Sequence, residues 1–281
     1  MYSIIILTHN KAVYTRACLE SILKCGCRDV QVVVLDNGST DETPALLDEM
    51  KIKFSEAGGE MKTVLHDRNI GCSTARNQGV DNAEGRYIVF LDNDTVIPDP
   101  QWLTKMSSVL EEEPGARIVG PKICYPFEPY WIQCAGVGVS RSGRVQFRGR
   151  GRPNDLPQFN RREEVQALIS ACFMFDADLP REIGGLDEAF NPVQYEDIDF
   201  CYRARSKGHR VIYTPDPAIY HWESITSDGT AALPNKYLIV KHGMIFKSRW
   251  KHMFEREDGP ADEDCKWQTI DMPSLEGRRK R

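Results

Sequence analysis

The chain has 281 residues, of which 41% are hydrophobic, which is enough apolar material for one large domain or two closely packed halves. The formal net charge is -5 and the sequence pI is about 5.8, so no basic excess indicates a nucleic-acid partner. The nine cysteines show no zinc-binding or disulfide spacing. We interpret them as reduced thiols, most of them in the core, in a reducing compartment.

The N-terminus opens directly into an apolar run, and no basic and apolar leader precedes it. No stretch of the chain approaches the roughly 18 apolar residues that a membrane span requires. We therefore expect a soluble, cytoplasmic protein.

The first half of the chain alternates short apolar runs, rich in β-branched residues, with longer amphipathic stretches. The short runs predict buried strands, and the longer stretches predict helices with one apolar face. One helix start is marked by Pro44, with Asp41 or Thr43 as its cap. Strands are predicted at 4–7, 30–35, 62–66 and 86–91, and helices at 11–25, 42–57 and 71–83. This alternation predicts an α/β fold with a mostly parallel sheet covered by helices on both faces.

The second half is less regular. Residues 121–165 are rich in Gly, Pro and Arg and are predicted to form mainly turns and hairpins. Helices are predicted at 100–112 and 196–207, and strands at 116–120 and 165–175. Residues 226–254 form a basic, partly amphipathic segment, and the acidic tail from Glu255 is predicted to be disordered.

Polar clusters follow each predicted strand of the first half. Ligands of parallel sheets bind beyond the carboxyl ends of the strands, so these clusters should converge at one edge. They are Thr8-His-Asn10, Asp36-Asn-Gly-Ser39, Asp67-Arg-Asn69 and Asp92-Asn-Asp94.

Asp92 and Asp94 point the same way from an extended backbone. Two carboxylates at a strand end can hold a hard divalent cation that bridges to a diphosphate, although Asp and Asn also cap turns. Asp36 ends the second predicted strand. It can accept hydrogen bonds from a ribose hydroxyl or a base N–H, or it caps the following turn.

Glu196 and Asp197 stand at a predicted helix start, where acids commonly complement the helix dipole. The functional alternative is a general base that removes a proton from an attacking hydroxyl. His221 follows a predicted strand and is either a packed core histidine or a third metal ligand, since imidazole suits Mn²⁺ or Zn²⁺ better than Mg²⁺.

Two basic regions remain open to interpretation. One forms either a solvated loop or an anion-binding flap, and its members are Arg141, Arg144, Arg148, Arg150, Arg152, Arg161 and Arg162. The other is either a helix packed on the core or a peripheral membrane face, and its members are Lys236, Lys241, Lys247, Arg249 and Lys251, interleaved with Ile239, Phe246 and Trp250.

Taken together, the motifs resemble the bacterial family 2 glycosyltransferases, especially rhamnosyltransferase-like members. The resemblance spans roughly residues 2–222. It is carried by Ile5-Ile-Leu-Thr-His-Asn10, Val34-Leu-Asp-Asn-Gly-Ser-Thr-Asp41, Asn69-Ile-Gly71 with Ala75-Arg-Asn-Gln-Gly79, Gly85-Arg-Tyr-Ile-Val-Phe-Leu-Asp-Asn-Asp94, Gly184-Gly-Leu-Asp-Glu-Ala-Phe190 and Tyr195-Glu-Asp-Ile-Asp-Phe-Cys-Tyr-Arg203.

The resemblance implies a GT-A fold, with a Rossmann-like sheet and a smaller mixed sheet on the acceptor side. It implies a donor-binding half at 1–95, an acceptor-binding half at 96–225 and a C-terminal extension at 226–281. Nucleoside or donor binding is implied for Thr8, Asn10, Asp36, Asn69 and Arg76. Diphosphate and metal binding is implied for Asp92 and Asp94, with His221 completing the metal site. Catalysis is implied for the Glu196-Asp197 pair, with the aspartate as base.

The function implied is an inverting transfer of a sugar from a dTDP-, UDP- or GDP-linked donor, with Mn²⁺ or Mg²⁺. The acceptor would be a glycan, a lipid-linked glycan or a protein, and the enzyme would sit in the cytoplasm or at the inner face of the membrane. Two alternatives are a sugar nucleotidyltransferase and a catalytically silent scaffold. The loop at 8–12 lacks the glycines typical of the former, and intact Asp92, Asp94 and Asp197 argue against the latter.

Overall fold

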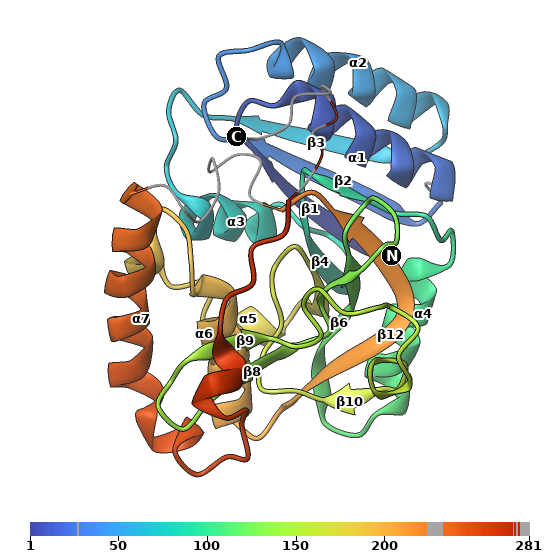
Figure 1. Ribbon diagram of the computed structural model, residues 1–281. Helices are drawn as coiled ribbons and strands as arrows, with labels where there is room; N and C mark the ends of the chain where they lie inside the picture. The colour runs from blue at the N-terminus through green and yellow to red at the C-terminus, as the bar shows by residue number, and fades with distance from the viewer. Residues whose placement is uncertain (27, 224–232, 272, 274, 276–281) are drawn as a thin grey trace.

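The computed structural model describes residues 1–26, 28–223, 233–271, 273 and 275. Their centre is a ten-stranded sheet with the main path β10-β12-β6-β11-β4-β1-β2-β3, while β5 pairs with β12 and β7 with β6. A separate two-stranded sheet is formed by β8 and β9 (Figure 1). The α/β fold predicted from the sequence is confirmed.

The first half forms the parallel part of the sheet. Its strands are β1 (Tyr2–Thr8), β2 (Val30–Asp36), β3 (Glu60–Leu65) and β4 (Tyr87–Asp92). In register, Thr8 lies beside Asp36 and Leu7 beside Asp92, so the carboxyl ends of these strands are level. Level strand ends bring the polar residues that follow them to one edge of the sheet.

The helices of this half connect consecutive strands. They are α1 (Ala12–Cys25), α2 (Thr43–Glu56) and α3 (Cys72–Asp81). Helices α1 and α2 pack on each other, whereas α3 returns the chain from β3 to β4 and, by the right-handed crossover rule, covers the opposite face. A Cβ added to Gly79 would meet Ile5 Cγ2 at 2.4 Å, so a glycine is needed where α3 approaches the sheet.

The second half completes the sheet with both strand directions. Strand β11 (Cys172–Asp176) runs antiparallel between β4 and β6 (Ala116–Cys124), and β12 (Arg210–His221) runs parallel to β6. The remaining strands are β5 (Thr95–Val96), β7 (Ile132–Cys134), β8 (Val137–Val139), β9 (Val145–Phe147) and β10 (Glu163–Glu164). The helices are α4 (Trp102–Glu112), α5 (Leu179–Ile183), α6 (Glu196–Ser206) and α7 (Leu233–Phe254), with short 3-10 turns at Pro157–Phe159, Glu188–Phe190 and Asp262–Cys265.

The predicted strand at 165–175 is corrected by the structure. Within this range, the strand begins only at Cys172 and runs to Asp176. The residues before it form a buried irregular segment. The segment satisfies its backbone outside a ladder: Val165 N–H donates to Val211 O, and Ser170 N–H donates to the Asp197 carboxylate. Apolar composition predicted burial here correctly, but it could not separate a strand from a buried loop.

The C-terminal segment after α7 also differs from the prediction. The tail from Glu255 was expected to be disordered, and its residues 272, 274 and 276–281 lie outside the described part of the chain. Residues 255–271, in contrast, pass in front of the sheet (Figure 1) and contact the β8–β9 hairpin. Acids of this segment pair with the arginine-rich region and with α6: Asp258 binds Arg141 at 3.3 Å, and Glu257 binds Arg205 of α6 at 2.8 Å. Charge complementarity therefore holds a segment that has too few apolar residues to form a core of its own.

Helix α7 lies beside α6 on one side of the molecule (Figure 1). Phe246, Trp250 and Phe254 form its buried face, while Tyr237, Val240 and Met244 are exposed. Two aromatic residues that had been considered for a membrane face, Phe246 and Trp250, therefore belong to the core. Among the described residues, no helix has the length and apolar character required to cross a bilayer.

Candidate functional site

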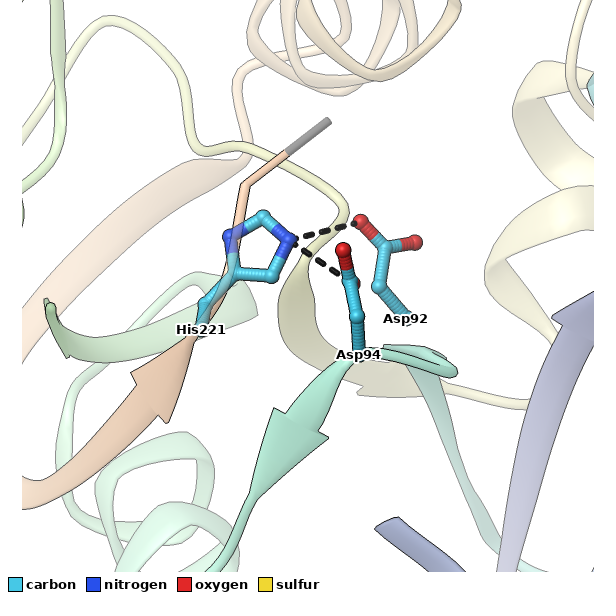
Figure 2. Close-up of side chains that lie close together, drawn as sticks. All are labelled: Asp92, Asp94 and His221. Carbon is cyan, nitrogen blue, oxygen red and sulfur yellow. Dashed lines mark ion pairs between the residues drawn. The ribbon is translucent and has the colours of Figure 1, made fainter. Parts of the chain in front are cut away.

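Three side chains from distant parts of the sequence converge at the end of the parallel strands. Asp92 and Asp94 lie either side of a tight turn between β4 and β5, and His221 ends β12 (Figure 2). His221 Nε2 lies 3.0 Å from Asp94 Oδ1 and 3.6 Å from Asp92 Oδ2. One ligand atom from each residue lies within 4.8 Å of the others.

Backbone pairing explains this convergence. His221 pairs with Thr95 in the β5–β12 ladder, and Trp222 N–H donates to Asp94 O at 3.0 Å. The Thr95 hydroxyl donates to Asp92 O at 2.8 Å and closes the turn. Two residues of strand pairing thus hold the end of β12 against the carboxylate turn.

The ring of His221 is oriented by a residue that the sequence analysis did not identify. Gln133, in β7, is fully buried, and its Oε1 lies 2.6 Å from His221 Nδ1. With Nδ1–H donating to this oxygen, Nε2 faces the two carboxylates. The only sequence signal for Gln133 is a polar residue between apolar neighbours in Ile-Gln-Cys134.

The three groups fit a divalent cation. Two carboxylates and one imidazole form a mixed oxygen and nitrogen donor set that suits Mn²⁺. Burial lowers the pKa of His221, but the charges of Asp94 and Asp92 outweigh it and raise the pKa to about 9. A cation at this position would replace the proton on Nε2, because imidazole coordinates a metal only when that nitrogen is deprotonated.

Arg76, in α3, is 2% exposed and links the carboxylate turn to the second half of the chain. Its guanidinium binds Asp92 Oδ1 and the hydroxyl of Ser170, and Glu196 Oε1 lies 4.0 Å from Nη1. Such a buried cation is tolerated only because carboxylates and hydrogen-bond acceptors surround it. Arg76 therefore fixes Asp92 rather than extending freely into the cleft.

Asp197 lies at the start of α6 and is only partly buried, unlike its neighbour Glu196. Its Oδ2 accepts from Ser170 N–H at 2.9 Å, and its Oδ1 accepts from Ile198 N–H at 2.8 Å. Burial nevertheless raises the pKa of Asp197, with these N–H groups opposing the rise. The result is a rigidly held carboxylate beside the cleft whose proton affinity is increased.

Glu196 is in a different environment. Burial, followed by the charge of Asp197, raises the pKa of Glu196 to about 7. Its Oε2 has no hydrogen-bond partner within the described part of the chain. Of the two adjacent acids, Glu196 thus faces the buried Arg76, and Asp197 is the one that borders open space.

The residues expected at the nucleoside end are held by hydrogen bonds between loops. Asn69 Oδ1 accepts from Asn37 Nδ2 at 2.8 Å, and Asn10 Oδ1 accepts from Thr40 N–H at 2.8 Å. Asp36 Oδ1 accepts from Ser39 N–H at 2.9 Å, and the Thr8 hydroxyl shares a 2.9 Å hydrogen bond with Thr15. Asn10 and Asp36 thus shape the loops that follow β1 and β2.

A cleft of about 1020 Å³ joins most of these groups. The expected site residues that line it are Thr8, Asn69, Arg76, Asp92, Asp94, Glu196, Asp197 and His221. Asn10 and Asp36 are not in its lining. Residues of α7, the β8–β9 hairpin and the C-terminal segment form other parts of its wall. Of these, the sequence analysis had considered Arg144 as part of an anion-binding flap, and it did not assign Phe147, Cys265 or Trp267 to the site.

The arginine-rich loop is extensively ion-paired. Arg148 and Arg161 both pair with Glu163, and Arg162 pairs with Glu112 at 3.0 Å. Arg150, 7% exposed by its side chain, binds Glu223 at 2.8 Å. The pairs explain why many arginines occur in a chain of net negative charge: most of those described hold loops together.

The family described as Glycosyl transferase family 2 matches residues 3–184 of this chain. The chain belongs to this family. Its sequence is 30% identical over 260 residues, 89% of the chain, to an uncharacterized protein, y4gI, of Sinorhizobium fredii. It is 38% identical over 124 residues, 44% of the chain, to a PGL/p-HBAD biosynthesis glycosyltransferase of Mycobacterium bovis. The chain spans 28% and 47% of these two relatives, respectively.

Solved glycosyltransferase structures share the fold. The mannosyltransferase PcManGT of Pyrobaculum calidifontis, in complex with GDP-Man and Mn²⁺, has a TM-score of 0.59 at 19% identity, covering 90% of this chain and 70% of that one. GalNAc-T7, with UDP, GalNAc and Mn²⁺, has a TM-score of 0.68 at 18% identity, covering 90% and 50%. The protein therefore has the GT-A fold of a glycosyltransferase, as its sequence motifs predicted.

Proposed function

We propose that this glycosyltransferase inverts configuration in a single displacement, using a nucleotide-diphosphate sugar and a hydroxyl acceptor. The observation that carries the proposal is the arrangement of one cleft. It is lined by a cation-binding cluster, Asp92, Asp94 and His221, and by a separate partly buried carboxylate, Asp197. These are the two groups that such a displacement needs.

In this mechanism, Asp197 accepts the proton of the acceptor hydroxyl as its oxygen forms a bond to the anomeric carbon. The bond from that carbon to the diphosphate oxygen breaks on the opposite face, and the nucleoside diphosphate leaves. A divalent cation bound by the cluster would neutralise charge on this leaving group. The hydrogen bonds from Ser170 and Ile198 hold Asp197 in place, which reduces the entropy lost in reaching the reactive geometry.

Glu196 supports the site rather than taking the proton. It lies behind Asp197 and beside Arg76, which in turn binds Asp92. We propose that Thr8 and Asn69 contact the donor directly and that Asn10 and Asp36 shape the nucleoside end. The donor nucleotide would be dTDP, UDP or GDP, and the transferred sugar a hexose or rhamnose. Two structural neighbours support this class of donor, because one was solved in complex with GDP-Man and the other with UDP and GalNAc.

Nucleotide-sugar binding is the first test. Thermal unfolding should be followed with dTDP-, UDP- and GDP-sugars, with and without Mn²⁺, because a ligand that binds the folded state raises the midpoint. We expect one nucleotide to raise it in a metal-dependent way. Asp94→Ala should abolish the shift, whereas Asp48→Ala, at an exposed position in α2, should leave it intact. No shift with any donor would contradict the proposal, and binding without turnover would favour a scaffold.

We further propose a cytoplasmic enzyme that associates peripherally with anionic membrane and acts on a lipid-linked glycan. The exposed apolar residues of α7, Tyr237, Val240 and Met244, lie among exposed lysines such as Lys241. Apolar side chains with flanking lysines are typical of helices that lie on anionic bilayers. The cysteines support a reducing compartment, because all eight that the structure describes are free thiols.

Liposome sedimentation tests the membrane proposal. The protein should sediment with vesicles rich in phosphatidylserine at low salt and less with neutral vesicles. The double substitution Y237D/K241E should weaken this binding, whereas Lys51→Glu, exposed on α2, should have little effect. Absence of sedimentation at low salt would exclude this surface as a membrane contact.

A further inference from the structure

Trp267 occupies an unusual position in the C-terminal segment. It lines the same cleft as Asp197, and 46% of its surface is exposed. Exposed tryptophan is costly in water, and this one has no core to join. Its indole packs instead against Phe147 of β9, with ring centroids 5.3 Å apart and planes at 73°.

The support behind the indole is rigid. The guanidinium carbon of Arg150 lies 3.8 Å from the Trp267 ring centroid, so the two planar groups are in close contact. Arg150 is itself fixed: its two terminal nitrogens bind Glu223 at 2.8 and 2.9 Å, and its Nε donates to Gln268 O at 2.8 Å. Each of the three guanidinium nitrogens thus makes a hydrogen bond, and the indole rests on a fixed planar group.

We propose that Trp267 is an aromatic platform on which a pyranose ring of the acceptor stacks. A pyranose presents a face of C–H groups to which a fixed indole is complementary, and pre-organisation reduces the entropy cost of binding. Side chains that can bond sugar hydroxyls line the same cleft, among them Gln194, Arg144 and Lys247. The acceptor class is accordingly a glycan, or a glycoconjugate whose terminal residue is a sugar, and this inference rests on the proposed function.

The platform residues come from other parts of the chain than most of the groups proposed to bind the donor. The groups proposed to bind the donor follow strands β1, β3 and β4 of the first half, with His221 added from β12. Trp267, Phe147 and Arg150 all come from the second half, which also contributes Asp197. A sugar bound at Trp267 would therefore lie in the same cleft as Asp197, the base proposed to activate its hydroxyl.

Saturation-transfer NMR tests the platform without knowledge of the natural acceptor. The probes are methyl glycosides of glucose, galactose, mannose, N-acetylglucosamine and rhamnose, added in the presence of nucleoside diphosphate and Mg²⁺, which is diamagnetic and does not broaden the NMR signals. At least one should bind the wild-type protein, and Trp267→Ala should raise its Kd about 3- to 10-fold. Trp267→Phe, which keeps a flat ring, should be affected less. Tyr237→Ala, an exposed aromatic residue of α7, is the matched control and should bind as wild type.

Two results would overturn the platform: no glycoside binds the wild type, or Trp267→Ala binds as tightly as the wild type. Nucleotide-sugar binding, followed by thermal shift in the same variants, keeps this outcome separate from the proposed function. Trp267→Ala should retain the metal-dependent donor shift, because Trp267 is not a donor contact. If the wild type itself showed no thermal shift with any nucleotide-sugar, the glycosyltransferase mechanism would be contradicted, whatever the glycoside measurements showed.

Discussion

The two halves of the chain position their functional groups by different physical means. In the first half, parallel strands in register carry polar residues to one edge, with Thr8 beside Asp36 and Leu7 beside Asp92. The backbone ladder sets these positions, and the side chains then bond neighbouring loops. A group placed in this way depends little on any single side-chain contact.

In the second half, contacts between side chains position the functional groups. Asp199 is fully buried and bonds Arg203, Arg249 and Trp250, which ties α6 to α7. The Arg150–Glu223 pair similarly holds the segment that follows His221. Polar networks of this kind are costly when partly broken. Substitutions in the second half should therefore alter function through positioning, even at residues that do not touch substrate.

The largest effect is expected at the base. Asp197→Asn keeps the size of the side chain but removes its ability to take a proton, so the turnover rate should fall by about 10²–10⁴-fold. Donor affinity should change little, because Asp197 is not among the cation ligands. Steady-state transfer assays, with donor binding measured in parallel, check both parts. Near wild-type turnover with a verified acceptor would rule out Asp197 as the base.

An intermediate effect is expected at the residue that orients His221. Gln133→Leu removes the acceptor for Nδ1–H, and Mn²⁺ affinity should weaken by about 10- to 100-fold. Gln133→Glu is the matched control because it keeps an acceptor oxygen, and it should retain tight binding. Electron paramagnetic resonance of free Mn²⁺ measures the affinity. Equal affinity in the leucine variant would mean that the strand pairing of β5 and β12 alone positions the ring.

The smallest effect concerns pH and stability. Burial raises the pKa of Glu196 from its ordinary 4.5 to about 7, so the folded state binds this proton more tightly than the unfolded state does. Its contribution to stability is therefore greatest below about pH 4.5 and declines as pH rises toward 7. Glutamine does not titrate, so the Glu196→Gln variant should lack this pH-dependent decline in stability. Between pH 5 and 8, the midpoint of thermal unfolding of the variant should fall less than that of the wild type, by on the order of a few degrees.

A control separates this titration from general destabilisation. Glu188→Gln, at an exposed site in the turn Glu188–Phe190, should leave the wild-type pH dependence unchanged. If Glu196→Gln also leaves the slope unchanged, Glu196 is ionised throughout this range, and the neighbouring Arg76 governs its state more strongly than burial does.

Sequence patterns indicated some residues of the candidate site and gave no signal for others. The local pattern left two interpretations open, a cation site or a turn for Asp92 and Asp94, and a metal ligand or a core histidine for His221. The family resemblance favoured the metal site, and the structure brings all three side chains together. Gln133 and Trp267 carried no comparable signal, because each acts through contacts with residues more than 80 positions away along the chain.

The sequence by itself determined the alternation of strands and helices, the α/β class, the family and the cluster at the strand ends, because these depend on short-range periodicity and turn chemistry. Tertiary structure decided which faces and loops meet. It buried Phe246 and Trp250 rather than exposing them, and placed Glu196 toward Arg76 and Asp197 toward the cleft. It also placed the segment after α7 against the arginine-rich loop, where Asp258 pairs with Arg141 and Asp262 with Arg144. Those outcomes follow from packing and charge pairing between distant segments, which no local pattern encodes.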